Sequence, residues 1–345
     1  MKKIRLAIIG NGLISHAHAA GFRAIEGVEI AACCDIIEEK AKSFAGQYGI
    51  PAYYTDFTEL LDKEKPDAVS IATPDAVHAA MATEALKRGV HTFSEKPLSS
   101  DLEGAAKMNE AACEAAGKGI MTGVNFPKRV FPCSQKMAEM VCGGELGRVL
   151  RFEARYRQSW RTTDCWGESS KNPAFQWRLS KKHGLGCIGD IGVHVFDLTS
   201  YVCGDFEGLF CCLDCYDLEP RKAGGYVFDA NEAMHSVVRL KNGITGAIHT
   251  ARTDTGFVDE VSLIVFCENG ALDLNQAREA DKMLLVCRGE NRNRAVWEPV
   301  ECPPVPDNYR SFIDSVKSGK QGRPSFAEGY KVQKYVDAGF RSAET

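Results

Sequence analysis

The side chains best suited to chemistry in this sequence lie in two segments that are far apart. In the first segment, Lys96 stands within Glu95-Lys96-Pro97 and follows an apolar, strand-like run at residues 90–93. A lysine at the carboxyl end of a parallel strand would lie where doubly wound sheets bind their ligands. Its positive charge would there stabilise an oxygen that becomes negative during a reaction. In the alternative reading, the tripeptide is an exposed charge pair before a proline that ends the strand.

The second segment carries an acid and a base at helical spacing. Asp190, His194 and Asp197 follow Gly189 at intervals that place all three on one face of a predicted helix. Histidine is the side chain best suited to take a proton near neutral pH, and an adjacent carboxylate orients it and raises its basicity. Alternatively, Asp190 caps the helix, His194 is a satisfied core histidine and Asp197 only holds the helix in place.

A glycine turn between the first predicted strand and the first predicted helix matches a dinucleotide-binding pattern. Gly10 allows a tight turn, and Gly12 allows the backbone to approach a pyrophosphate that lies on the helix N-terminus. Ser15 replaces the usual third small residue, which only has to permit close helix packing. Asp35 ends the second predicted strand, 25 residues after Gly10. This is close to the spacing at which a carboxylate binds a ribose 2′-hydroxyl.

The same carboxylate predicts which dinucleotide is bound. Asp35 would repel a 2′-phosphate, and Ile36 follows where NADP would require a cationic residue. We therefore expect NAD as the cofactor in preference to NADP.

The elements that must position these residues fall into two patterns. Residues 1–123 alternate strand and helix, which predicts βαβ units, a parallel sheet and a dinucleotide-binding domain of the α/β class. A helix is predicted at residues 36–47, with acids at its start and a Gly-Ile-Pro stop after it. The predicted strands of this half are residues 4–9, 28–34, 68–72, 90–93 and 120–124.

Residues 124–345 are predicted to form a second domain of the α+β class. Period-two strands begin near Arg148, and Asn-Gly pairs at 242–243 and 269–270 predict hairpins because both turn positions accept positive φ. An open, mostly antiparallel sheet with flanking helices is therefore expected, the last two helices at residues 309–317 and 326–342.

Composition excludes several classes of protein. The chain has 345 residues, 44% of them hydrophobic and 26% charged, and a net charge of −4 without a basic stripe, so no nucleic-acid partner is expected. The apolar run near the N-terminus is too short for a signal peptide, and none reaches the roughly 18 residues of a membrane span. We expect a cytoplasmic protein with no membrane partner.

The 14 cysteines are expected to be reduced, because many lie within apolar strand patterns of a large chain without a secretion signal. Residues 212–215 form a CxxC, but no second CxxC or histidine pair is spaced to complete a zinc site. We therefore predict no metal.

Taken in order, the motifs resemble those of the glucose-fructose oxidoreductase / inositol dehydrogenase / MocA (Gfo/Idh/MocA) family, over essentially the whole chain. The matching residues are Gly10-Asn11-Gly12 with Asp35, the segment from Thr73-Pro74 to His78, Glu95-Lys96-Pro97, Asn125 with Arg129, and the segment from Gly189 and Asp190 through His194 to Asp197. The resemblance implies an N-terminal Rossmann domain for NAD(P) and a C-terminal sheet domain for substrate contact and oligomerisation.

The resemblance also implies roles for individual residues. Lys96 would bridge the nicotinamide ribose and the substrate hydroxyl, His194 would be the general acid/base, and Asp190 would assist by contacting substrate. The residues expected to contact the cofactor are Gly10, Asn11, Gly12, Leu13, Ile14, Asp35, Thr73, Pro74, His78, Glu95, Lys96 and Asn125. Those expected to contact the substrate are Lys96, Arg129, Trp160, Arg161, Trp177, Arg178, Asp190 and His194. The tryptophans and their neighbouring arginines are included because their residue types suit stacking on a polyol ring and hydrogen-bonding to it; alternatively, each tryptophan is a packing residue.

Three functions are compatible with these residues. The first is an NAD-dependent dehydrogenase that oxidises a secondary hydroxyl of a cyclic polyol or sugar of the inositol, pyranose or anhydro-sugar type. The second is an NAD-dependent glycoside hydrolase that oxidises its substrate transiently, and the third is a dinucleotide-binding regulator without catalysis. Alternating apolar residues at 262–266 and 283–286 also predict a sheet face covered by a partner, in a homodimer or homotetramer.

Overall fold

The computed structural model describes residues 3–345, which fold into two compact units. One unit comprises the described residues up to Phe126 together with Pro306–Gln333, and the other comprises Pro127–Val305 and Lys334–Thr345. The predicted division into residues 1–123 and 124–345 places the first boundary within a few residues of this one. The prediction differs from the structure near the C-terminus, where Pro306–Gln333 return to pack on the first unit.

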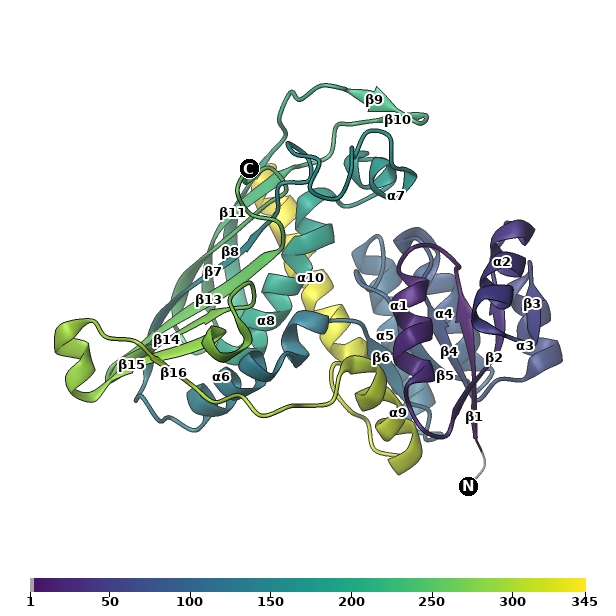
Figure 1. Cartoon of the computed structure of the whole chain (residues 1–345), viewed down its shortest axis with the longest axis horizontal. Coiled ribbons are helices and arrows are strands. Elements are labelled where there is room, and N and C mark those ends of the chain that lie inside the picture. The colour runs from purple at the N-terminus through teal and green to yellow at the C-terminus, as the bar shows by residue number, and fades with distance from the viewer. Residues whose placement is uncertain (1–2) are drawn as a thin grey trace. The chain divides into compact units, whose positions relative to one another are not determined.

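The first unit is built on a six-stranded parallel sheet with the order β3-β2-β1-β4-β5-β6 (Figure 1). The order reverses between β1 and β4, and doubly wound sheets bind ligands beyond the carboxyl ends of the strands at such a point. The strands are β1 Ile4–Ile9, β2 Val28–Cys34, β3 Ala52–Tyr54, β4 Ala68–Ile71, β5 His91–Ser94 and β6 Thr122–Val124.

Helices connect these strands and cover the sheet. α2 ends as predicted at a glycine, since Gly49 adopts a left-handed φ of 62° after the last helical turn. The returning helix α9 places Phe312 beside Phe22 and Phe93 in a buried aromatic cluster. The helices are α1 Ser15–Arg23, α2 Glu38–Tyr48, α3 Phe57–Glu64, α4 His78–Lys87, α5 Leu102–Ala116, α9 Asn308–Ser318 and the start of α10 Phe326–Ala343.

The second unit is built on an eight-stranded sheet with the order β16-β15-β14-β13-β7-β12-β11-β8. Neighbouring strands are antiparallel except for β7 and β12, which run parallel, so the prediction of a mostly antiparallel sheet is confirmed. The strands are β7 Val149–Arg157, β8 Phe206–Asp214, β11 Ala233–Leu240, β12 Thr245–Ala251, β13 Glu260–Cys267, β14 Gly270–Asn275, β15 Leu284–Arg288 and β16 Glu298–Pro299.

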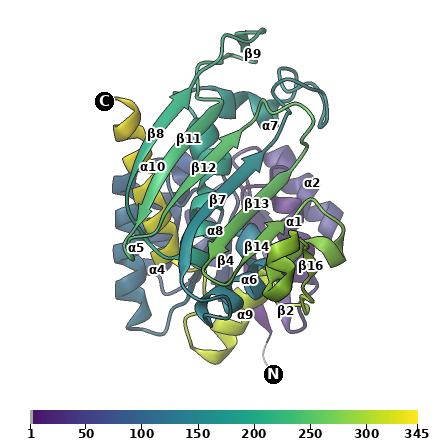
Figure 2. The ribbon, with the colours of Figure 1, turned by 90° about the vertical axis from the view of Figure 1, so that its left-hand side faces the viewer.

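One face of this sheet is packed and the other is open. Along β11 and β13, buried and more exposed residues alternate, as a strand with one covered face requires. Figure 2 looks onto the open face, with the helices of the unit behind the sheet. The remaining elements of the unit are α6 Pro132–Cys142, α7 Pro173–Gln176, α8 Val193–Cys203, the end of α10, and a two-stranded ribbon of β9 Lys222–Ala223 and β10 Tyr226–Val227.

Both predicted hairpins are present, but their turns differ from the expected type. β11 and β12 are joined through Asn242-Gly243, and β13 and β14 through Glu268-Asn269. Gly243 has a φ of 84°, whereas neither asparagine is among the described residues with a positive φ. The turns therefore do not use positive φ at both central positions.

Across residues 3–345, the helices lack the length and hydrophobicity needed to span a bilayer.

Candidate functional site

The glycine turn of the first unit has the backbone geometry that its sequence predicted. Gly10 is buried at a φ of 85°, and a Cβ there would lie 2.8 Å from the carbonyl carbon and oxygen of Ala72, so only glycine fits. At Gly12 a Cβ would meet nothing within 4 Å. The turn is therefore tight toward the sheet and open on its outer side, where a ligand would approach.

Beyond the turn, the chain presents exposed apolar side chains and then a helix N-terminus. Leu13 is 73% exposed and Ile14 is 43% exposed. α1 begins at Ser15, whose hydroxyl donates a hydrogen bond to the Gly12 carbonyl over 2.5 Å. The small serine side chain thus tightens the turn, and the helix N-terminus is positioned to receive a phosphate group.

Asn11 joins this turn to the predicted ribose-binding acid. Its backbone N–H donates to Asp35 Oδ2 over 2.8 Å, and Ile37 N–H donates to Asp35 Oδ1 over 3.0 Å. The buried side-chain amide of Asn11 and the hydroxyl of Thr73 find no hydrogen-bond partner within residues 3–345. Buried polar groups are normally paired, so a polar ligand is the missing partner that these atoms indicate. The turn thus fits a bound dinucleotide.

Glu95 is a buried member of a hydrogen-bond network rather than a group open to a ligand. Its Oε1 lies 2.8 Å from His18 Nε2 and accepts from Asn125 Nδ2 over 2.5 Å, while Oε2 accepts from the Lys96 backbone N–H over 3.1 Å. Burial would raise the pKa of this carboxyl, but His18, Lys96 and Asn125 together lower it to about 2. Glu95 therefore stays ionised and fixes the backbone of Lys96.

Sequence reasoning missed the partner of Glu95. His18 is fully buried, and its Nδ1 lies 2.7 Å from Ser70 Oγ. Asn308 of the returning helix α9 donates to Asn125 Oδ1 over 3.0 Å and extends the network. A histidine on the buried face of the first helix could have been noticed in the sequence, but its pairing with Glu95 spans 77 residues and carries no sequence signal.

His78 ties two loops together. Its Nδ1 lies 3.0 Å from the Pro97 carbonyl and its Nε2 lies 2.9 Å from the Thr73 carbonyl, with the ring 1% exposed. Pro74 is exposed between them in the chain. The geometry gives His78 a positioning role, since it holds the loop of Thr73 and Pro74 against the loop that follows Lys96.

In the second unit, the predicted acid and base lie on two consecutive helical segments, but the first of these differs from the helix expected. Residues Ile188–Gly192 form one π-helical turn and the α-helix α8 begins only at Val193. Asp190 therefore lies in the π turn, a feature that is frequent at functional sites. His194 follows in α8 and is 6% exposed, with its ring centre 5.9 Å from that of Tyr156.

Two arginines flank the carboxylate of Asp190. Arg178 Nε lies 3.4 Å from Asp190 Oδ1, and Arg252 Nη1 lies 3.8 Å from Asp190 Oδ2. Arg252 is fully buried, donates from Nε to Glu232 Oε2 over 3.0 Å and from Nη2 to the Asn231 carbonyl over 2.8 Å. The Asp190 carboxylate therefore lies beside two positive charges. Arg252 and Glu232 were not predicted, because nothing in the sequence around them marks a site.

The two predicted Trp-Arg pairs, Trp160-Arg161 and Trp177-Arg178, differ in burial. Trp160 is 1% exposed and donates from Nε1 to Gln158 Oε1 over 2.9 Å, and the 7% exposed Arg161 pairs with Glu232 at 3.1 Å. These two therefore build the interior of the unit. Trp177 and Arg178 are partly exposed, with the guanidinium carbon 4.5 Å from the indole ring centre. This second pair retains a surface for a ligand.

Arg129 and Asp197 form a buried ion pair. Arg129 Nε donates to Asp197 Oδ2 over 2.9 Å and Nη2 donates to Asp197 Oδ1, with Asp197 fully buried. The Arg129 guanidinium also lies 4.6 Å from the ring centre of Tyr201. The guanidinium of Arg129 is thus bound to Asp197 and lies against Tyr201. The geometry therefore supports a structural role for this ion pair. The alternative that Asp197 holds the helix in place agrees with this contact.

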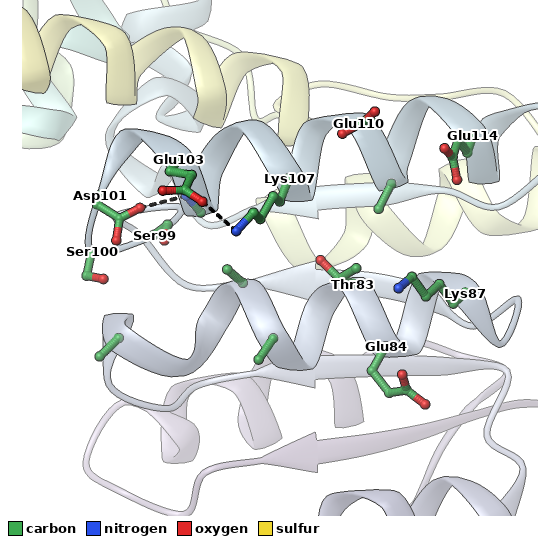
Figure 3. Close-up of a pocket in the computed structure, with 15 residues that line it drawn as sticks. Thr83, Glu84, Lys87, Ser99, Ser100, Asp101, Glu103, Lys107, Glu110 and Glu114 are labelled. Carbon is green, nitrogen blue, oxygen red and sulfur yellow. Dashed lines mark hydrogen bonds and ion pairs between the residues drawn. The ribbon is translucent and has the colours of Figure 1, made fainter.

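The first unit also has a hollow that lies away from the glycine turn and Lys96. A cavity of about 690 Å³ opens between α4 and α5, with an alanine-rich floor and charged side chains at its rim (Figure 3). Glu103 pairs with Lys107 at 2.6 Å, and Asp101 caps α5. None of the predicted site residues lines this hollow.

The fold and the turn together define a class of protein. A doubly wound parallel sheet, a glycine turn that only glycine can form and a carboxylate after β2 are the features of a nicotinamide-dinucleotide-binding oxidoreductase domain.

Comparison with known proteins defines the class further. Residues 4–124 match the model described as the oxidoreductase family, NAD-binding Rossmann fold, and residues 134–273 match the GFO/IDH/MocA C-terminal domain. The chain belongs to the Gfo/Idh/MocA oxidoreductase family, and it is an NAD-dependent oxidoreductase.

Two relatives match over nearly their full length. The chain is similar to levoglucosan dehydrogenase of Pseudarthrobacter phenanthrenivorans, with 24% identity over 99% of this chain and 97% of the relative. It is also similar to myo-inositol 2-dehydrogenase of Thermotoga maritima, with 26% identity over 97% of this chain and 96% of the relative. The solved complex of levoglucosan dehydrogenase with NADH and levoglucosan has the same fold, with a TM-score of 0.89 at 24% identity over 99% of this chain and 98% of that one.

Proposed function

We propose that this protein is an NAD-dependent dehydrogenase that oxidises a secondary hydroxyl of a cyclic polyol or sugar. The observation that carries the proposal is the acid–base cluster of the second unit, in which a buried His194 follows Asp190 and two arginines flank the Asp190 carboxylate. Oxidation of an alcohol requires a group that accepts the hydroxyl proton, and histidine is suited to this near neutral pH.

In the proposed reaction each residue has one task. NAD, when bound, supplies the hydride acceptor. His194 accepts the proton of the substrate hydroxyl, and Lys96 places a positive charge where the alkoxide develops. Asp190 accepts a hydrogen bond from substrate. Glu95 fixes the Lys96 backbone from a buried position, so the point from which the lysine side chain extends is set before substrate arrives.

Trp177 and Arg178 support a ring-shaped, polyhydroxylated substrate. An indole face offers apolar stacking to the C–H face of a sugar ring, and a guanidinium offers several donors to ring hydroxyls. Relatives similar along their whole length are named for levoglucosan and myo-inositol, which are compact polyhydroxylated rings. We propose a substrate of the inositol, pyranose or anhydro-sugar type.

We further propose that the open face of the eight-stranded sheet is covered by a second copy in a homodimer or homotetramer. Phe210 on β8 is 62% exposed and Val237 on β11 is 59% exposed, and both project from this face. Sedimentation at micromolar concentration is expected to show a dimer or tetramer, and a monomer alone would overturn this proposal.

A substrate panel tests the function directly. Inositols, pyranoses, anhydro sugars and aryl glycosides are incubated with the enzyme and NAD, while NADH absorbance and glycoside release are followed together. Net NADH formation with one of the first three groups is the expected result. Release of the aryl group without net NADH formation would instead support the glycoside hydrolase. The absence of both signals would overturn the proposal.

A further inference from the structure

Asn231, shortly before β11, contacts the start of the helical run that carries Asp190. Its side chain and backbone are largely enclosed, with 7% of the residue exposed. The backbone carbonyl accepts from the Cys187 N–H over 2.8 Å, and the side-chain Oδ1 accepts from the Ile188 N–H over 3.1 Å. Nδ2 donates to the Leu185 carbonyl over 3.2 Å. One asparagine thus forms three hydrogen bonds with the segment that leads into the π turn.

These contacts take the place of a helix N-cap. The first backbone N–H groups of a helix have no partner within it, and a side-chain oxygen of the preceding residue usually accepts from one of them. Here the helical run begins at Gly186, Leu185 before it is apolar, and the Cys187 side chain forms no capping hydrogen bond. Asn231 supplies the acceptors instead, from a position 46 residues after Leu185.

Gly186 fits closely against the side-chain amide of Asn231. It adopts a φ of 67°, and a Cβ on this residue would lie 2.4 Å from Asn231 Nδ2 and 2.8 Å from Asn231 Oδ1. A side chain at position 186 would therefore displace the amide from the backbone groups that it binds. The contact thus depends on glycine on one side and on asparagine on the other.

Asn231 also orients one of the two arginines beside Asp190. Its backbone carbonyl accepts from Arg252 Nη2 over 2.8 Å, and Arg252 Nη1 lies 3.8 Å from Asp190 Oδ2. The side chain of Asn231 meanwhile binds the N–H of Ile188, at the first position of the turn that contains Asp190. One residue therefore holds both the turn that carries the carboxylate and a cation that faces it.

We propose that Asn231 is a positioning residue for substrate oxidation, which sets the place of the Asp190 carboxylate through the start of the π turn. The inference rests on the proposed function, in which Asp190 accepts a hydrogen bond from substrate. A displacement of about 1 Å in such a contact can lower a rate on the order of 100-fold. The cofactor turn belongs to the other unit. Loss of the Asn231 amide should therefore lower kcat/KM for the substrate and leave NAD affinity unchanged.

Asn231→Ala tests the proposal, because it removes both amide contacts and retains the backbone carbonyl. We expect kcat/KM for the best panel substrate to fall roughly 10- to 100-fold, with NAD affinity within about twofold of the parent. Asn231→Asp keeps an oxygen that can accept from the Ile188 N–H, and its kcat/KM should return to within about fivefold of the parent. An aspartate variant as impaired as the alanine variant would contradict the capping role.

Gly186→Ala breaks the same contact from the other side. Its added Cβ displaces the Asn231 amide while every hydrogen-bonding group remains in the chain. Its kcat/KM should also fall, again without a change in NAD affinity, and it supplies the measurement if Asn231→Ala does not fold. A Gly186→Ala enzyme with the kcat/KM of the parent would overturn the proposal.

The matched control is Asn242→Ala. Asn242 Nδ2 donates to the carbonyl of Cys203 over 3.0 Å, at the last residue of α8. The variant thus removes the same type of side chain from the other end of the same helical run. Its kcat/KM should stay within about twofold of the parent. An equal loss in Asn231→Ala and Asn242→Ala would indicate a general weakening of the helix and would overturn the positioning role.

A double-mutant cycle shows whether Asn231 acts through Asp190. In the Asp190→Ala background, Asn231→Ala should lower kcat/KM by less than about threefold further, because residues that act through one contact are not additive. The full additional loss in that background would overturn the proposal. So would an impaired Asp190→Ala enzyme beside an Asn231→Ala enzyme with the kcat/KM of the parent. If Asp190→Ala itself keeps that kcat/KM, the proposed role of Asp190 fails, and this inference fails with it.

Discussion

The two units build their sites by different physical means. In the first unit, the cofactor turn depends on backbone geometry: Gly10 is the residue that the close approach of Ala72 permits, and Asp35 is held by two backbone N–H groups. In the second unit, Asp190 is flanked by two arginines from distant segments, and Arg252 is itself paired with the buried Glu232. One site is local and made by the main chain, and the other is assembled from side-chain charges.

This difference predicts how each site fails when it is altered. A backbone-built turn tolerates side-chain changes around it, and its failures are failures of cofactor binding. A charge-built cluster couples chemistry to folding, because removing one partner leaves another charge buried. Substitutions in the two units should therefore separate cofactor affinity, turnover and stability.

The largest loss of activity is expected from Lys96→Ala. It removes the positive charge that we propose lies near the alkoxide and the proposed orienting contact to the cofactor, so kcat should fall at least as far as the roughly 10²- to 10⁴-fold typical of a lost acid–base group. Steady-state kinetics on the best panel substrate, at saturating NAD, measures this. Lys87→Ala, an exposed lysine at the end of α4, is the control and should keep the parent kcat.

His194→Ala should lower kcat by roughly 10²- to 10⁴-fold, because it removes the proposed proton acceptor. NAD affinity, measured by fluorescence titration, should change little, since the residue belongs to the unit that does not carry the cofactor turn. Asp190→Asn should have a smaller effect than either substitution, because it keeps a hydrogen-bonding group. A His194→Ala enzyme within about threefold of the parent kcat would identify His194 as a core residue.

The sequence predicted the first unit well because its signals are local. The strands at Ile4–Ile9 and Val28–Cys34 match the predicted ranges, and the tight glycine turn follows the first of them as predicted. The hydrogen bond between the Asn11 N–H and Asp35 was not predicted. The short strand Ala52–Tyr54 was missed, since three residues carry too little pattern. The return of Pro306–Gln333 to this unit was also missed, because only tertiary packing reveals it.

The second site was only partly predictable. The sequence indicated Asp190 and His194, but helical spacing cannot distinguish an α turn from the π turn that the structure contains. It also predicted substrate contact for both Trp160-Arg161 and Trp177-Arg178, although the first pair is buried and the second is partly exposed. Arg252 reaches Glu232 over 20 residues and Arg161 reaches it over 71, and no local pattern encodes such pairings.

The charge-built nature of the second site is tested by Arg252→Met. Removing one partner of a buried ion pair typically costs about 3–5 kcal/mol. In this variant Glu232 retains Arg161 and Asp190 retains Arg178, but each carboxylate loses its contact with Arg252. Urea unfolding should show a loss of about this size. Arg294→Met, an exposed arginine in the segment between β15 and β16, should change stability by less than about 0.5 kcal/mol. Equal effects of the two substitutions would contradict the comparison between the units.

Glu95 predicts an acid-sensitive step in the stability of the first unit. Its pKa is lowered from 4.5 to about 2 in the folded protein. The resulting stabilisation is fully present above pH 4.5 and is lost as the pH falls toward 2, with a size on the order of 3 kcal/mol. Unfolding free energies measured between pH 6 and pH 3 should fall less steeply in Glu95→Gln than in the parent. The exposed Glu114→Gln should follow the parent, and a Glu95→Gln profile with the parent's slope would refute the assignment.

The smallest expected effect, and the most specific, is a change of cofactor preference in Asp35→Ser. In the parent, the Asp35 carboxylate would repel a 2′-phosphate, so NAD should be preferred over NADP. Removing the charge should narrow the ratio of kcat/KM for the two cofactors by roughly tenfold, or about 1.4 kcal/mol. The exposed Glu39→Ser is a control that removes a nearby charge outside the turn.

The two functions of Asp35 can be separated in the same experiment. Because Asp35 also accepts the N–H groups of Asn11 and Ile37, the serine variant loses hydrogen bonds that shape the turn, and this loss should weaken both cofactors alike. Charge repulsion, in contrast, acts on NADP alone. If Asp35→Ser lowers the affinities for NAD and NADP equally, the carboxylate only shapes the turn. If the parent already uses NADP at least as well as NAD, the predicted preference is wrong.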